Sequence, residues 1–136
     1  SSRFAKLLEE LKFGEAGLVP VVIADARDNR VLTLCYIDRE ALEQTLETGL
    51  VHVFRRSKGR LMLKGEVSGH TQQVKQVAID CQGKSLLMTV EQRVAACHAG
   101  YWSCYYREYE GATDCFVVKE QRLFDPGEVY QAGFEV

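Results

Sequence analysis

The stretch that decides how this chain folds and works, residues 80–107, reads DCQGKSLLMTVEQRVAACHAGYWSCYYR. An apolar run at its centre is typical of a buried strand, and three cysteines surround that run, Cys81, Cys97 and Cys104. Thiolates are good zinc ligands, and three protein ligands leave a fourth position open for water, as in catalytic zinc sites. The spacing is not C-x-x-C, so it matches no zinc ribbon or redox motif. The alternative is that the three residues are small buried hydrophobic side chains, the usual role of free cysteine.

Composition limits the class of protein. The 136 residues suit a single domain covering residues 1–136, and a hydrophobic content of 46% is enough for a core. A net charge of -2 and a pI near 5.9 argue against nucleic acid as the main partner. No apolar run is long enough to span a membrane, so no membrane partner is expected. Five cysteines, an odd number, favour a reducing compartment, and we expect a cytoplasmic protein.

The hydrophobic pattern predicts an α+β fold, predominantly antiparallel β, with two short helices in the N-terminal half. One helix is expected at Ser2–Lys12, and a second from the N-cap residue Asp38 to Thr48, with Gly49 placed to end it. The first two strands should form a hairpin, because residues rich in Asp and Asn separate them. Strands are expected at Val19–Ala24, Val31–Ile37, Leu50–Phe54, Leu61–Leu63, Gln73–Cys81, Ser85–Val90, Cys104–Tyr109 and Phe116–Phe124.

Four cations fall within six residues at 55–60, around a predicted turn. Guanidinium groups match phosphate oxygens, so Arg55, Arg56 and Lys58 are candidates for binding a phosphorylated substrate. The alternative is a solvated loop, which is what most charge runs are.

A polar loop follows at residues 64–70, with Lys64, Glu66 and Ser68 around two glycines. Glycine permits positive φ and close backbone approach, and dense polar loops of this kind position substrates. His98 directly follows Cys97, so it is either a fourth zinc ligand or a general acid and base near the metal, with a surface imidazole as the alternative.

Together these motifs resemble the phosphoribosyl-AMP cyclohydrolase family of histidine biosynthesis. The resemblance runs from about Phe13 to Arg107. The motifs that carry it are Lys64-Gly65-Glu66-x-Ser68-Gly69, Asp80-Cys81-x-Gly83, Glu91-Gln92, Ala96-Cys97-His98-x-Gly100 and Ser103-Cys104-x-Tyr106-Arg107.

The resemblance implies a zinc-dependent hydrolase that opens the purine ring of phosphoribosyl-AMP between N1 and C6. It implies a homodimer, with zinc held by Cys97 and Cys104 of one chain and Cys81 of the other. A small purine nucleotide is then the expected substrate. Assigned roles are catalysis for His98, Lys64 and Glu66, and substrate binding for Arg55, Arg56, Lys58 and Ser68. Lys64 is also among the cations that would hold phosphate.

This chain departs from the family pattern in three places, one of which is the absence of a tryptophan common before Lys64, where Met62 and Leu63 stand. The family holds magnesium with three aspartates at positions 80, 82 and 84, of which Asp80 remains beside Gln82 and Lys84. One carboxylate beside an amide and an ammonium is a poor magnesium site, because Mg²⁺ prefers anionic oxygens. Tyr101-Trp102 stands where the family usually has two arginines, which exchanges phosphate-binding cations for aromatic faces. The alternative function is therefore a divergent paralogue that acts on another heterocycle, or one that binds a small molecule around a structural zinc without turnover.

Overall fold

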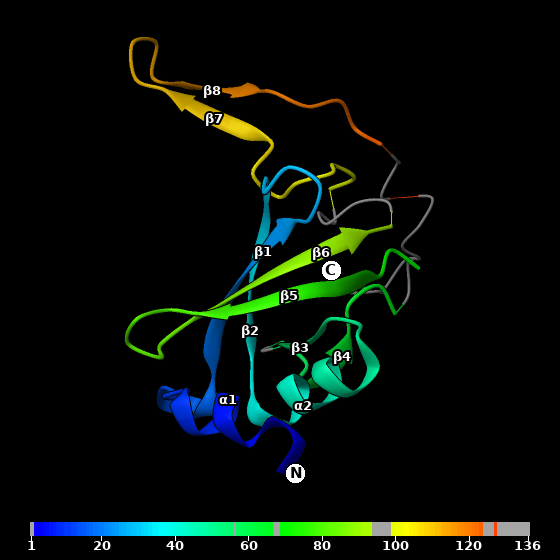
Figure 1. The fold of residues 1–136 in the computed structure, drawn as a ribbon. Coiled ribbons are helices and arrows are strands. Elements are labelled where there is room, and N and C mark those ends of the chain that lie inside the picture. Colours follow the sequence, from blue (N-terminus) through cyan, green and yellow to red (C-terminus); the bar gives the residue numbers. More distant parts are fainter. Residues whose placement is uncertain (1, 56, 67–68, 94–98, 124–126, 128–136) are drawn as a thin grey trace.

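The fold is seen in a computed structural model, and the structure describes residues 2–55, 57–66, 69–93, 99–123 and 127. Figure 1 shows the elements in chain order. They are the 3₁₀ turn η1 (Ser2–Phe4), α1 (Ala5–Glu10), the 3₁₀ turn η2 (Glu15–Gly17), β1 (Val19–Asp25), β2 (Val31–Ile37), α2 (Arg39–Thr48), β3 (His52–Arg55), β4 (Arg60–Leu63), β5 (Gln72–Ile79), β6 (Leu86–Gln92), β7 (Arg107–Glu110) and β8 (Cys115–Val118).

A four-stranded sheet in the order β2-β1-β6-β5 forms the centre of the molecule. The predicted hairpin is confirmed, since β1 and β2 pair antiparallel with Val19 opposite Ile37. The β5–β6 pair is antiparallel as well, whereas β1 and β6 run parallel, with Val21 beside Leu86. The α+β class with mostly antiparallel strands is therefore confirmed, with one parallel pair at the centre of the sheet.

One face of the sheet carries the hydrophobic core. Alternate residues of a strand point to the same face, and Val21, Ile23 and Met88 on this face are completely buried. Leu8 of α1 and Leu42 of α2 belong to the same buried cluster. Both helices therefore pack their apolar sides against this face.

The opposite face of the sheet is exposed and apolar. The strand register places Leu34, Val22, Leu87 and Ala78 side by side in one row across all four strands. Leu34 is 45% exposed and Leu87 is 41% exposed. Contiguous apolar surface of this kind is typical of an interaction site.

Helix α2 begins and ends where the sequence predicts. The Asp38 carboxylate accepts a hydrogen bond from the backbone N–H of Ala41 at 2.8 Å, which caps the first turn. Gly49 adopts the left-handed conformation, with φ of 77°, and its N–H bonds to the carbonyl of Thr45.

Three predicted elements are shorter than expected. The helix predicted at Ser2–Lys12 is α-helical over Ala5–Glu10, because Leu11 is already extended. The strand predicted at Cys104–Tyr109 begins at Arg107, and the strand predicted at Phe116–Phe124 ends at Val118. The four residues after Val118, KEQR, are polar, so no alternating apolar pattern supports a longer strand there. Within the described ranges, no helix is long and apolar enough to cross a membrane.

Candidate active site

Three of the predicted site residues, Arg55, Lys64 and Cys104, line one cavity of about 360 Å³. This volume is within the usual range for small-molecule sites. The cavity lies between β2 and the β3–β4 hairpin, with two cations and two thiols at its wall. Its other lining residues are Thr33, Leu34, Cys35, Tyr36, Val53, Phe54 and Ser57.

The two cations are placed by the β3–β4 hairpin. Arg55 ends β3 opposite Arg60, and its carbonyl accepts hydrogen bonds from the turn residues that follow. Lys64 directly follows β4, and its N–H bonds to the carbonyl of Val51 at 2.9 Å. Gly65 comes next with φ of 87°, and a Cβ there would lie 2.6 Å from the His70 backbone. The glycine of the predicted polar loop is therefore required by the backbone.

Cys104 lies in a segment without regular secondary structure, and it is half-buried. Its N–H donates to the carbonyl of Leu32 at 2.7 Å, which holds it beside the start of β2. The hydroxyl of the buried Ser103 donates to the carbonyl of Val31 at 2.8 Å. Two adjacent residues are thus fixed to the same strand.

A second cysteine of the cavity, Cys35, behaves as a core residue. Its thiol lies 3.8 Å from the carbonyl of Val21, and it packs against the hydrophobic cluster. Burial raises the pKa of the Cys35 thiol to about 11, with a smaller opposing effect of Lys64. Because zinc ligands are thiolates, this protonated thiol is a poor ligand.

Cys81 is exposed in the β5–β6 turn. The Cys81 turn leads directly into Leu86, which lies beside Val21 near the start of β1. Cys104 is hydrogen-bonded to Leu32, which lies beside the end of β1. Cys81 and Cys104 therefore lie at opposite ends of the sheet. Among the residues that the structure describes, no three His, Cys, Asp or Glu side chains gather as a metal site.

The Cys81 turn is held against α1 by backbone contacts. The carbonyl of Gly83 accepts a hydrogen bond from Lys12 N–H at 2.7 Å, and a Cβ on Gly83 would lie 2.2 Å from the Glu10 carbonyl oxygen. Glycine at this position allows the turn to approach the end of the helix and gives Cys81 a fixed location.

Asp80 uses its carboxylate within the same turn. It accepts hydrogen bonds from the Ser85 hydroxyl at 2.6 Å and from the N–H groups of Lys84 and Gln82, both at 2.9 Å. These bonds, the one from Ser85 first, lower the pKa of Asp80 to about 2. The remaining carboxylate of the family's magnesium motif thus stabilises the turn, and Gln82 and Lys84 add no anionic oxygen to it. These residues do not fit a magnesium site.

The other predicted site residues are less closely associated with the cavity. Glu66 lies 4.0 Å from Arg60 in an exposed ion pair, and Lys58 is exposed in the β3–β4 turn. Neither is among the cavity-lining residues. The remaining predicted site residues lie outside the described residues, namely Arg56, Ser68, Cys97 and His98.

Both aromatic residues that replace the family's arginines are engaged within the chain. Tyr101 stacks on Tyr106, with ring centroids 3.7 Å apart and planes 4° apart. Trp102 donates its indole N–H to Asp25 at 3.0 Å and lies under the Arg27 guanidinium at 4.8 Å. Neither residue lines the cavity, so the exchange gives no support to an aromatic platform for a different substrate.

Sequence reasoning missed several residues of the cavity and its surroundings. Ser57 lies within the cationic run, where the neighbouring cations are the stronger sequence signal for phosphate binding. Thr33 and Tyr36 lie on opposite faces of β2, and an alternating strand pattern does not reveal which face borders a cavity. Asp25, which accepts the Trp102 indole N–H, was also missed. The signal that could have identified it is a carboxylate at the end of an apolar strand.

A cavity lined by cations and thiols has groups that are able to bind a small phosphorylated molecule. The family model described as phosphoribosyl-AMP cyclohydrolase matches residues 33–106, which include all of the cavity residues. The chain belongs to this family, a family of hydrolases, and the resemblance seen in the motifs is confirmed.

Named relatives agree with this assignment. The phosphoribosyl-AMP cyclohydrolase of Methanosarcina barkeri is 47% identical over 87% of this chain and 88% of its own length. That of Pelotomaculum thermopropionicum is 47% identical over 90% of this chain and 95% of its own. The histidine biosynthesis bifunctional protein HisIE of Thermoanaerobacter pseudethanolicus is 48% identical over 93% of this chain, which spans 57% of that longer protein.

Proposed function

We propose that this protein is a phosphoribosyl-AMP cyclohydrolase of histidine biosynthesis, which hydrolyses the purine ring between N1 and C6. The observation that carries the proposal is the cavity, because it brings Arg55 and Lys64 together with Cys104 in a chain that belongs to the family. No disulfide joins any two of the four described cysteines, which supports a reducing compartment such as the cytoplasm.

The donor set fits zinc. Cys104 is half-buried at the cavity and Cys81 is exposed in its turn, so both thiols are accessible to an ion, unlike the high-pKa thiol of Cys35. We propose that Cys104, Cys97 and Cys81 of a second copy hold Zn²⁺. Bound zinc supplies Lewis acidity, which makes water a nucleophile near neutral pH.

The residues of the chain bind and orient the substrate and move its protons. Arg55 and Lys64 can donate charge-assisted hydrogen bonds to phosphate within the cavity, and Arg56, Lys58 and Ser68 are assigned to the same task by their motifs. Hydrolysis adds water at C6 and breaks the C6–N1 bond, and N1 takes a proton. We assign this proton transfer to His98, from its position beside Cys97, and a supporting catalytic role to Glu66.

A homodimer completes the site in this proposal. Cys81 and Cys104 lie at opposite ends of the sheet, too far apart for one chain to join them around one ion. The exposed apolar face runs between these ends, and the hollow on it is lined by Val22 and Leu87 together with Asp80, the neighbour of Cys81. Two copies packed through this face about a two-fold axis would each bring their Cys81 end toward the partner's Cys104 end.

The test of the function is turnover of phosphoribosyl-AMP by the zinc-loaded protein. We expect a loss of purine absorbance with kcat on the order of 1–10³ s⁻¹, the usual range for enzymes. A protein that binds zinc, is folded and does not turn over this substrate would contradict the proposal and favour the divergent paralogue with a structural zinc.

Magnesium is expected to be unnecessary for activity, because the Asp80 carboxylate is engaged within its turn and Gln82 and Lys84 replace the other two aspartates. Zinc-loaded protein freed of magnesium should have the same kcat and KM with and without added Mg²⁺. The matched variant carries Gln82→Asp and Lys84→Asp, and it should bind Mg²⁺ in a calorimetric titration where the natural chain does not. A strict magnesium requirement of the natural chain would show that Asp80 exchanges its turn contacts for the ion.

A further inference from the structure

The segment that carries Cys104 is held by a few isolated backbone hydrogen bonds and by side-chain contacts. Residues 99–106 form turns and bends, so no ladder of backbone hydrogen bonds fixes them as a strand would be fixed. The segment is nevertheless well packed, with Gly100 and Ser103 buried and Trp102 half-buried against the core. The contacts that hold Trp102 therefore act together with the backbone hydrogen bond from Cys104 to Leu32 in fixing where Cys104 lies.

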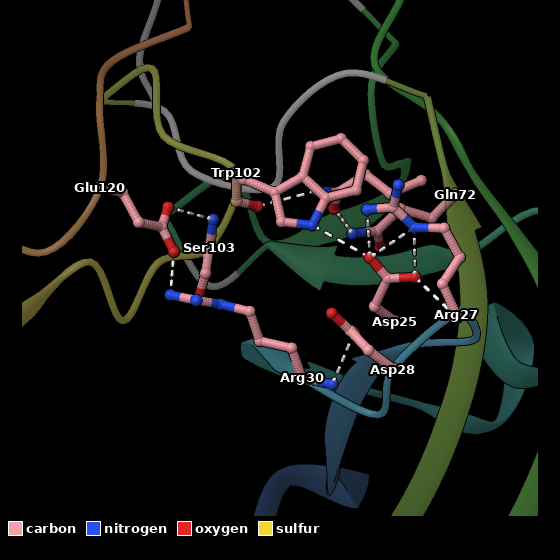
Figure 2. Close-up of polar contacts among 9 residues, drawn as sticks. Asp25, Arg27, Asp28, Arg30, Gln72, Trp102, Ser103 and Glu120 are labelled. Carbon is pink, nitrogen blue, oxygen red and sulfur yellow. Dashed lines mark hydrogen bonds and ion pairs between the residues drawn. The ribbon is translucent and has the colours of Figure 1, made fainter.

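Asp25 holds Trp102 from one side (Figure 2). This carboxylate at the end of β1 is 1% exposed and accepts the Trp102 indole N–H at 3.0 Å. Arg27 donates its backbone N–H and its Nη2 to the same carboxylate, both at 2.9 Å, and places its guanidinium over the indole ring. The hydrogen bond from the Arg27 side chain lowers the pKa of Asp25, so the carboxylate stays ionised. The edge and the face of the indole are both held by this pair.

Two glutamines hold Trp102 from the other side. Gln92, at the end of β6, donates its side-chain amide to the Trp102 carbonyl at 2.8 Å. The completely buried Gln72 of β5 donates to Gln92 at 2.7 Å. Trp102 is thus tied to β1, β5 and β6, and the next two residues are tied to β2. All four central strands fix the two residues before Cys104.

We propose that Asp25 is a positioning residue for metal binding: it fixes Trp102 and so places the Cys104 thiol for the ion. The inference rests on the proposed zinc site. Asp25 does not line the cavity, so it acts through Trp102 and does not touch substrate. The Asp25 carboxylate is buried although its partner Arg27 is largely exposed, and burying a charged group is costly unless it is paired and hydrogen-bonded. The role of this ion pair is geometric, because it orients the indole of Trp102, two residues before the proposed ligand Cys104.

Cobalt binding tests the inference without relying on activity. Co²⁺ takes the place of Zn²⁺ and gives absorption bands that report thiolate ligation and coordination geometry. We expect Asp25→Asn and Trp102→Phe to weaken Co²⁺ binding about 10-fold or more and to change the ligand-field bands, as changes to groups that orient a metal ligand typically do. The double variant should be no weaker than Asp25→Asn alone, because both substitutions break one contact chain.

The matched control is Asp28→Asn, the same chemical change in the same turn. Asp28 is exposed and accepts the Arg30 N–H at 3.1 Å, with no contact to Trp102. This variant should bind Co²⁺ as the natural chain does. If Asp25→Asn fails to fold, Trp102→Phe still decides the question, since it keeps an aromatic ring beside Arg27.

The outcomes separate the inference from the function on which it rests. Folded Asp25→Asn and Trp102→Phe proteins that bind Co²⁺ with natural affinity and spectrum would overturn the positioning role and leave the zinc site intact. If the losses of Co²⁺ affinity in the two single variants multiply in the double variant, Asp25 does not act through Trp102, and the proposed link is overturned. A natural chain that binds neither Co²⁺ nor Zn²⁺ would overturn the zinc site itself, and the positioning role with it.

Discussion

Cys104→Ser is expected to lose its zinc and its activity while it keeps its fold. The zinc content measured by metal analysis should fall to background from about one zinc per chain, the stoichiometry of a three-thiolate catalytic site. Turnover of phosphoribosyl-AMP should fall below detection, because a serine hydroxyl stays protonated and does not replace a thiolate. The fold should survive, since the hydrogen bond that places this residue comes from its backbone N–H to Leu32.

The matched control for this substitution is Cys115→Ser. Cys115 is an exposed free thiol in the β7–β8 hairpin, where its sulfur lies 2.9 Å from the Thr113 hydroxyl. It does not line the cavity, so its replacement should leave zinc content and kcat unchanged. Full zinc in Cys104→Ser, or equal losses in both variants, would contradict the assignment of Cys104 as a ligand.

Local signals explain why much of the fold could be predicted. The limits of α2 follow from Asp38 and Gly49, whose capping roles depend on residues within one turn. The β1–β2 hairpin follows from two apolar runs with a polar turn between them. The parallel pairing of β1 with β6 was not predicted, because it joins segments far apart in the sequence and no local pattern identifies the partner strand.

In the site, too, residues that belong to local motifs could be predicted, whereas contacts between distant segments could not. Arg55, Lys64 and Cys104 were selected from the chemistry of their motifs, and the structure brings all three to one cavity. The contact between Asp25 and Trp102 spans 77 residues, so neither motif predicts it. The resemblance suggests Trp102 as an aromatic face for substrate because it stands where the family usually has an arginine, whereas its partners come from β1 and β6.

Paired cysteine variants are expected to show that the active site is shared between two copies. A dimer that combines one Cys81→Ser chain with one Cys104→Ser chain retains one complete ligand set, because the natural Cys81 of one chain meets the natural Cys104 of the other. The two chains can be co-expressed with different affinity tags and purified as the mixed dimer. We expect about half of the natural activity and zinc content per dimer, although each variant alone is inactive.

The control uses the same two substitutions placed in one chain. A dimer of the natural chain with a Cys81→Ser, Cys104→Ser double variant has one broken ligand in each shared site, so it should be inactive. If each chain instead held zinc with its own cysteines, the results would be exchanged: the double-variant dimer would keep about half of the activity and the first mixed dimer would keep none. The shared arrangement is expected because the β5–β6 turn and the Cys104 segment lie at opposite ends of one sheet, and the apolar row through Leu34 and Leu87 offers the face that brings two copies together.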